Sequence, residues 1–245
     1  DFSTYFLFST GFRPGGFTSA GTLPITPFDE ERAKNFEIGF RSSFLENQVQ
    51  LTGSFFFIDY DDIQVVSAAP SALALTGFET VIINADEAES YGAEITLAAQ
   101  ITNKLTLNAS YGYNESEFSS FVDPILGDQT GNRLPNAPRH SVNVSAEYIE
   151  PVSFVRDGEA YFRADYTYRS DFISFLSPTA PVLDAYDVVD LRLGLRNEGF
   201  LVEAFVENVF DEVYALGTTT LIFGDVAALE VGPTRRFGIR GEIRF

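Results

Sequence analysis

The sequence of 245 residues contains no cysteine, tryptophan or methionine, and its only histidine is His140. Without cysteine there is no disulfide framework, no thiolate metal site and no cysteine nucleophile. Catalytic triads and transition-metal sites normally need a histidine with partners close by, and none is evident around His140. His140 follows Pro138 and Arg139 at the start of an expected strand, so we predict a structural or exposed role for it. We expect no enzymatic activity, no bound metal and no cofactor.

Basic residues are scarce: 16 Lys and Arg stand against 35 Asp and Glu, which gives a net charge of −19. The acidic balance disfavours nucleic-acid binding, because contacts to phosphates need a basic face. Adhesion to anionic lipid through a polybasic patch is disfavoured for the same reason. Asp59, Asp61 and Asp62 suggest calcium, but they lack the spacing and the bidentate glutamate of an EF-hand loop. We interpret them as the wet end of a strand.

The sequence also lacks any apolar run near the roughly 20 residues that a membrane-spanning helix requires. A spanning β-strand needs only about 9–11 residues and hides its apolar side chains by alternation. The end of the chain shows this alternation clearly. Phe237, Ile239 and Ile243 fall on one side of an expected strand, and Arg240 and Glu242 fall on the other. This pattern predicts a strand between an oily phase and a wet phase.

Similar alternation recurs along the chain, and no segment has a convincing helical period. We count about ten strands. In the first, residues 2–12, the sequence does not show which side chains face the apolar side. Apolar and polar side chains alternate in segments 36–44, 91–99, 105–113, 142–148, 162–168, 189–195 and 202–206.

The expected connections alternate between short and long. Residues 46–48, 102–104 and 197–199 form short turns, and 149–159 is intermediate. The long polar connections are 13–32, 61–80, 119–137, 172–185 and 211–231. Long loops on one side and tight turns on the other are typical of an outer-membrane barrel with extracellular loops above and periplasmic turns below. By this parity the C-terminus is periplasmic.

Aromatic residues on the apolar side gather toward the two strand ends and bracket an aliphatic band. A bilayer selects such belts at its two interfaces. The expected lipid-facing girdle consists of Phe44, Tyr111, Tyr113, Tyr148, Tyr166, Tyr168 and Phe245.

The opposite side of the same strands is rich in charge. It is interpreted either as a hydrated lumen whose charges pair between strands, or as a surface that grips a plug and changes contacts when the plug is pulled. The expected lumen-lining residues are Arg41, Glu94, Asn108, Arg163, Asp165, Arg192, Arg196, Glu203, Glu207, Arg240 and Arg244.

Short motifs along nearly the whole chain resemble those of TonB-dependent outer-membrane receptors. Each motif is weak alone, but their order and spacing together are specific. The motifs are GFRPGGF at 11–17, NFEIGFR at 35–41, FFIDYDDIQ at 56–64, NADEAESYGAE at 84–94, LPNAPRH at 134–140, ENVFDEVY at 207–214 and GPTRRFG at 232–238.

The resemblance implies an all-β fold, an antiparallel up-and-down transmembrane β-barrel in the Gram-negative outer membrane. Residues 1–245 would be a single partial domain, about ten C-terminal strands of a probable 22-strand barrel, with the plug domain absent from this chain. An open sheet with an oily face leaves two unpaired edges, which lipid does not tolerate. We therefore expect the working unit to be longer than 245 residues.

The resemblance also implies a transport receptor that imports a scarce ligand, most simply a ferric siderophore, with cobalamin, oligosaccharides and other chelates open. The expected partners are outer-membrane lipid, the ligand, the TonB complex acting through the plug, and the barrel-assembly machinery at the C-terminal strand. Phe12, Arg13, Phe17 and Arg133 are candidate ligand contacts in the loops. The acidic loops disfavour a bare anionic ligand unless Arg13 or Arg133 offsets their charge.

Two alternatives remain at this point. One is a small self-contained barrel of ten strands acting as a passive pore or as a surface protease, the latter needing His140 beside inward carboxylates. The other is a soluble β-sheet binding module.

Overall fold

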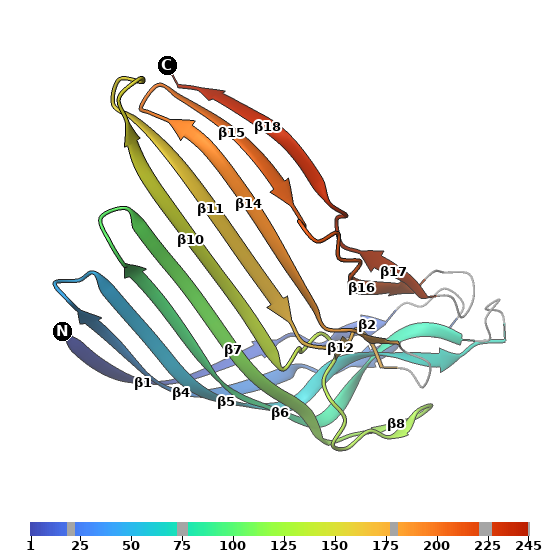
Figure 1. Cartoon of the computed structure of the whole chain (residues 1–245). Coiled ribbons are helices and arrows are strands. Elements are labelled where there is room, and N and C mark those ends of the chain that lie inside the picture. Colours follow the sequence, from blue (N-terminus) through green and yellow to red (C-terminus); the bar gives the residue numbers. More distant parts are fainter. Residues whose placement is uncertain (19–22, 73–77, 177–180, 221–226, 245) are drawn as a thin grey trace.

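The computed structural model describes residues 1–18, 23–72, 78–176, 181–220 and 227–244 (Figure 1). Ten long strands form one antiparallel sheet in which each strand pairs with the strands next to it along the chain. This confirms the expected up-and-down arrangement and the strand number. The strands of the sheet are β1 (Phe2–Arg13), β4 (Glu31–Phe44), β5 (Val49–Pro70), β6 (Phe78–Gln100), β7 (Leu105–Ser120), β10 (His140–Val152), β11 (Gly158–Arg169), β14 (Tyr186–Arg196), β15 (Phe200–Glu207) and β18 (Arg236–Ile243).

Tight turns join the strands at one end of the sheet, the short-turn end, where both chain termini lie (Figure 1). The other end, the long-loop end, carries four small two-stranded hairpins. These hairpins are β2 (Gly16–Thr18) with β3 (Thr26–Phe28), β8 (Val122–Asp123) with β9 (Gly127–Asp128), β12 (Phe172–Ile173) with β13 (Val182–Leu183), and β16 (Ala215–Thr220) with β17 (Ala227–Val231).

The sheet curves but does not close, because β1 and β18 each pair with one neighbour only within the described residues. The alternative of a self-contained ten-stranded barrel is therefore wrong for this chain. No helix of sufficient length and apolar character to cross a membrane is found in the ranges that the structure describes.

The two faces of the sheet separate apolar from polar side chains. Residues directly opposite each other on neighbouring strands point to the same face. Phe36 lies opposite Phe57, Leu97 opposite Ala109, and Leu193 opposite Ala204. The expected apolar positions therefore share one face, called the apolar face below, and the expected charged positions share the other, the polar face.

Within the ranges that the structure describes, no second layer packs on the apolar face. Leu193 is 60% exposed and Ile239 is 80% exposed, although both belong to well-formed strands. A soluble sheet would bury such a face against another layer of secondary structure. The soluble binding module is therefore disfavoured.

The buried core lies at the long-loop end. It contains Val65, Ala85, Ala88, Phe118, Phe121 and Leu176. β5 and β6 contribute because they have 22 and 23 residues, about ten more than a tilted membrane-spanning strand needs. The expectation of a loop over residues 61–80 is thus wrong for residues 61–70 and 78–80, which belong to strands, while residues 73–77 lie outside the described ranges. Asp62 adopts a φ of 57° and is skipped by the pairing of β5 with β6, which continues in the same register as far as Pro70 opposite Phe78.

Aromatic rings lie over glycines on adjacent strands at several points of the sheet. Tyr161 lies opposite Gly194, and a Cβ atom on Gly194 would come within 2.6 Å of its ring. Tyr5 lies over Gly39 in the same way. A ring over a glycine fills the space that the missing side chain leaves in the sheet.

Candidate functional site on the polar face and at the long-loop end

A chain of ion pairs crosses the polar face of four strands, from β11 to β18. Arg163 and Arg192 both reach Asp165, each with a shortest nitrogen–oxygen distance of 2.7 Å. Glu207 lies 3.8 Å from Arg192 and 2.7 Å from Arg236. These side chains are partly exposed, so the network lines a wet surface.

A second group lies nearer the short-turn end of the same strands. Arg196 bonds Glu147 at 3.1 Å and Glu159 at 3.3 Å, and its guanidinium lies 4.7 Å from the centre of the Tyr161 ring. The Tyr161 hydroxyl donates to Glu203 at 2.5 Å, and both residues are buried. Tyr161 was not predicted as a site residue from the sequence. The sequence hint is that an aromatic residue occupies a position that the alternation assigns to the polar face.

The middle of the polar face, on β6, β7 and β10, is mostly uncharged. Ser90 donates to Asn114 at 2.9 Å, and Thr167 donates to Asn143 at 3.3 Å. The polar face therefore has a charged sector and a sector of short hydroxyl and amide side chains. The uncharged polar residues of this sector are Ser90, Thr96, Asn108, Ser110, Asn114, Ser116, Ser141, Asn143 and Ser145.

Not all expected lumen residues join the networks. Arg240 and Arg244 both bond Glu242, at 3.1 and 2.9 Å. Arg41 and Glu94 are exposed on the polar face, and neither forms an ion pair within the described residues. Asn108 is exposed there as well. The structure places these expected residues on one face, and their lumen-lining role stays a prediction.

The expected girdle residues lie on the apolar face. Tyr111 and Tyr113 flank His140, with ring centres 6.0 and 5.4 Å from the imidazole, and the Tyr111 hydroxyl is 2.9 Å from His140 Nδ1. Phe44 and Tyr148 lie on the same face at the short-turn end. The remaining members are Tyr166 and Tyr168, which also share this face, and Phe245, which lies outside the described residues.

The position of His140 contradicts the protease alternative. That alternative needs His140 beside carboxylates of the polar face, whereas His140 lies among tyrosines on the apolar face. The nearby carboxylate of Glu115 bonds Arg139, with a nitrogen–oxygen distance of 2.9 Å.

The candidate ligand contacts are spread over the long-loop end. Phe12 and Phe17 are each 73% exposed, and Arg13 is exposed at the end of β1. Arg133 is engaged with Asp171: one guanidinium nitrogen bonds the carboxylate and the other bonds the main-chain carbonyl, each at 2.9 Å. Among the described residues, no contact joins these four candidate residues into one cluster.

Acidic side chains dominate the long-loop end, and several of its bases are engaged with them. Lys34 lies 3.4 Å from Asp59 and 2.8 Å from Asp61. Asp59 and Asp61, two of the three acids expected to mark the wet end of a strand, are thus paired with an ammonium group. No group of three or more potential metal ligands is found among the described residues.

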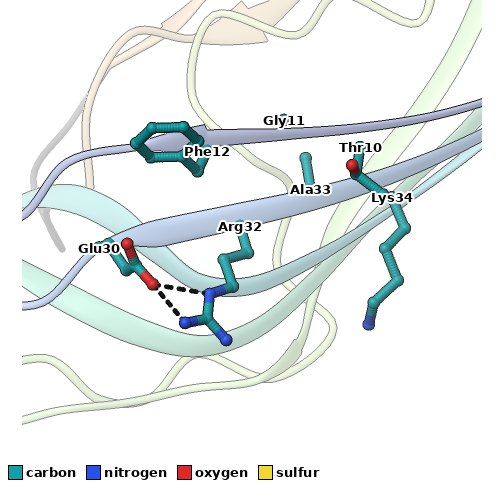
Figure 2. Close-up of a pocket in the computed structure, with 7 residues that line it drawn as sticks. All are labelled: Thr10, Gly11, Phe12, Glu30, Arg32, Ala33 and Lys34. Carbon is teal, nitrogen blue, oxygen red and sulfur yellow. Dashed lines mark hydrogen bonds and ion pairs between the residues drawn. The ribbon is translucent and has the colours of Figure 1, made fainter.

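Two hollows border the free edges of the sheet. One, of about 330 Å³, lies beside β1 and is lined in part by Phe12, Arg32 and Lys34. Figure 2 shows Arg32 turned toward Glu30, with Nε 2.8 Å from the carboxylate, while Lys34 extends away from them. The other, of about 580 Å³, lies beside β18 around Arg236. Because both hollows lie beside the edge strands β1 and β18, we expect neighbouring strands of a complete barrel to cover them.

A protein-family comparison matches residues 1–209 to the family model described as TonB dependent receptor-like, beta-barrel. A probable TonB-dependent siderophore receptor, PiuA of Acinetobacter baumannii, is 30% identical over 183 residues, covering 69% of this chain and 23% of that protein. The metal-pseudopaline receptor CntO of Pseudomonas aeruginosa is 28% identical over 208 residues, covering 84% and 27%. The chain therefore spans about a quarter of the length of these relatives.

Among solved structures, the ferric yersiniabactin uptake receptor FyuA of Yersinia pestis matches all of this chain and 35% of its own, with a TM-score of 0.78 at 22% identity. The crystal structure of PiuA matches 98% of this chain and 33% of its own, with a TM-score of 0.70 at 18% identity. At these identities the structural likeness shows the fold.

Proposed function

The chain belongs to the TonB-dependent receptor family, as a section of its outer-membrane β-barrel, and we propose that the complete receptor imports a metal chelate, most simply a ferric siderophore. The observation that carries the proposal is the exposed apolar face opposite a charged polar face, in a sheet whose residues 1–209 match the receptor barrel. The relatives PiuA, a probable siderophore receptor, and CntO, a metal-pseudopaline receptor, support a chelate as ligand.

In this proposal the apolar face contacts lipid and the polar face lines the lumen. The long-loop end faces the cell exterior, and the short-turn end, with the C-terminus, faces the periplasm. The ion pairs around Asp165 and Arg196 form the barrel side of the contact with a plug, on which the TonB complex pulls. The barrel-assembly machinery engages the C-terminal strand during insertion.

The charge of the long-loop end narrows the expected ligand. An acidic entrance repels anions and concentrates cations, an effect that salt screens over about 10 Å. Arg133 could have offset this charge, but Asp171 holds it. We therefore expect a neutral or cationic chelate to bind better than a strongly anionic one.

Uptake of iron-55 by cells that carry the complete receptor tests the proposal. Iron supplied as a neutral trishydroxamate chelate should enter only in cells with TonB, and a trianionic triscatecholate chelate should enter more slowly. Asp171→Asn should release Arg133 and reduce this difference. Equal uptake with and without TonB, or a steady channel conductance from the complete receptor, would instead indicate a passive pore.

A further inference from the structure

Two side-chain amides meet beneath the connection between β1 and β4. Gln64 of β5 and Asn84 of β6 lie directly opposite each other, just beyond Asp62, whose φ is 57°. They belong to two of the motifs that resemble the receptor family, and neither was assigned a role from the sequence. The described parts of this connection, residues 14–18 and 23–30, lie against this part of the β5–β6 pair: Thr18 and Asp29 bond β6, and β3 contacts it.

Gln64 holds the two ends of the connection together. Its Nε2 donates to the carbonyl of Pro14 at 3.0 Å and to that of Asp29 at 3.1 Å, with the Arg13 carbonyl at 3.4 Å. Its main-chain N–H donates to Glu31 at 2.8 Å. One residue thus bonds the point where the chain leaves β1 and the point where it enters β4.

Asn84 uses its whole amide on the same stretch of chain. Its Oδ1 accepts the N–H of Asp29 at 2.7 Å, and its Nδ2 donates to the carbonyls of Asp29 at 3.1 Å and Asp62 at 2.8 Å. The bonds fix Asp29 from both sides and tie it to the irregular point of β5. An asparagine amide can accept and donate in this way, whereas a carboxylate can only accept.

Thr18 and Gly15 complete the contact. Thr18 Oγ1 accepts the N–H of Ile82 at 3.0 Å and donates to its carbonyl at 3.2 Å. A Cβ on Gly15 would lie 2.5 Å from the carbonyl oxygen of Phe28, so only glycine lets the two arms of the connection approach this closely.

Apolar burial does not hold this connection in place. Phe17 is 73% exposed and Ile25 is 67% exposed. Hydrogen bonds to main-chain groups therefore carry the attachment, and they leave the exposed side chains free to contact a ligand.

We propose that Gln64 and Asn84 are positioning residues that fix the described parts of the connection, residues 14–18 and 23–30, on the β5–β6 hairpin and so place Phe12, Arg13 and Phe17 for ligand capture. The ligand part of this inference rests on the proposed function, whereas the attachment itself does not. The amides act on the loop backbone and need not touch the ligand.

The attachment is tested by spin labelling of the complete receptor. The sequence has no cysteine, so Ile25→Cys provides a single labelling site in this chain. With the native amides the nitroxide spectrum should show restricted motion. Gln64→Ala combined with Asn84→Ala should give a mobile spectrum, as should Gln64→Glu with Asn84→Asp, which keep the shapes but remove the donors. Gln50→Ala, on the same strand but exposed at the short-turn end, is the matched control. A restricted spectrum in both double variants would overturn the attachment.

The positioning role is tested with iron-55 as a trishydroxamate chelate on unlabelled receptors. The double alanine variant should bind the chelate about tenfold more weakly, while its uptake rate at saturating chelate stays within about twofold of the native rate. An unchanged affinity together with a mobile spectrum would overturn the positioning role. If the native receptor takes up no chelate, the proposed function fails, while the spin-label result still decides the attachment.

Discussion

The hydrogen bond between Tyr161 and Glu203 should stabilise the barrel measurably, because both partners are buried. The bond is 2.5 Å long, Tyr161 is 4% exposed and Glu203 is 8% exposed. Tyr161→Phe removes the hydroxyl and leaves the ring over Gly194. Glu203 then loses its only side-chain donor among the described residues.

Hydrogen bonds to charged groups contribute about 1.5–3 kcal/mol, and a buried acceptor left without its donor costs an amount in the same range. We therefore expect Tyr161→Phe to lower the free energy of unfolding by about 2 kcal/mol. Tyr148→Phe is the matched control, because its hydroxyl donates to Glu150 at 2.7 Å but both partners are exposed. Solvent replaces that bond, so its loss should have little effect.

Urea unfolding of the complete receptor in lipid vesicles measures both variants, and a double-mutant cycle with Glu203→Leu, which removes the acceptor, isolates the pair. The coupling energy of Tyr161 with Glu203 should account for most of the loss, at about 1.5–3 kcal/mol. Equal losses for Tyr161→Phe and Tyr148→Phe, or a coupling energy near zero, would show that burial of this pair does not determine its contribution.

Three further predictions concern backbone space, a buried amide and pH. Gly92→Ala should prevent assembly of the barrel, because the added Cβ would lie 2.0 Å from a main-chain oxygen of the next strand. Gly112→Ala is the control and should assemble normally, because a Cβ there meets open space. The yield of folded receptor in outer membranes measures both variants. Asn208→Ala should cost about 2–3 kcal/mol in urea unfolding, because this residue is 3% exposed and its amide bonds three main-chain groups. The hydrogen bond from the Thr130 N–H lowers the pKa of Asp128 below its usual 3.8, so the stability that this bond contributes is present above pH 3.8 and is lost as the pH falls through the lower pKa of the folded state. Amide exchange in segment 122–130 should therefore become faster at that low pH in the native receptor but not in Asp128→Asn. An exchange rate in the native receptor that matches Asp128→Asn at every pH would contradict this prediction.

The faces of the sheet could be predicted from the sequence because a strand has a period of two. Once Leu193 is assigned to the apolar face, Arg192 must lie on the other face, whatever the neighbouring strands do. The same rule assigns Phe237 and Arg240 to opposite faces. The strand pairing of the structure agrees with these assignments from β4 to β18.

The long-loop end could not be predicted in this way. The acidic run Asp59–Asp62 resembles the start of a loop in the sequence, but the pairing with β6 skips only Asp62 and continues in the same register through Ile63 and Val65. Arg133 pairs with Asp171, which is 38 positions away, and no local sequence pattern predicts such a contact. The bonds of Gln64 and Asn84 likewise depend on how the connection 14–30 folds back.

The location of these bonds affects where ligand specificity should be sought. Gln64 and Asn84 lie in motifs that carry the family resemblance, and so do Asn136 and Asn208. Each of their side-chain amides bonds main-chain groups of a connection at the long-loop end. A bond to a main-chain group is indifferent to the side chain of the residue it holds. Such motifs can therefore keep the loops in place in receptors with different ligands, and by themselves they say little about which ligand is bound.

Specificity must then reside in side chains that the amides position but do not contact. Phe17 is one such residue, exposed on β2 next to Thr18, which is bonded to β6. Replacing Phe17 by Ser should change the relative affinities for a trishydroxamate and a triscatecholate chelate of iron-55 and leave the amount of folded receptor unchanged. Asn208→Ala should do the reverse, lowering the amount of folded receptor and leaving the ratio of affinities unchanged. If both variants changed only the amount of folded receptor, the separation between holding the loops and choosing the ligand would be wrong.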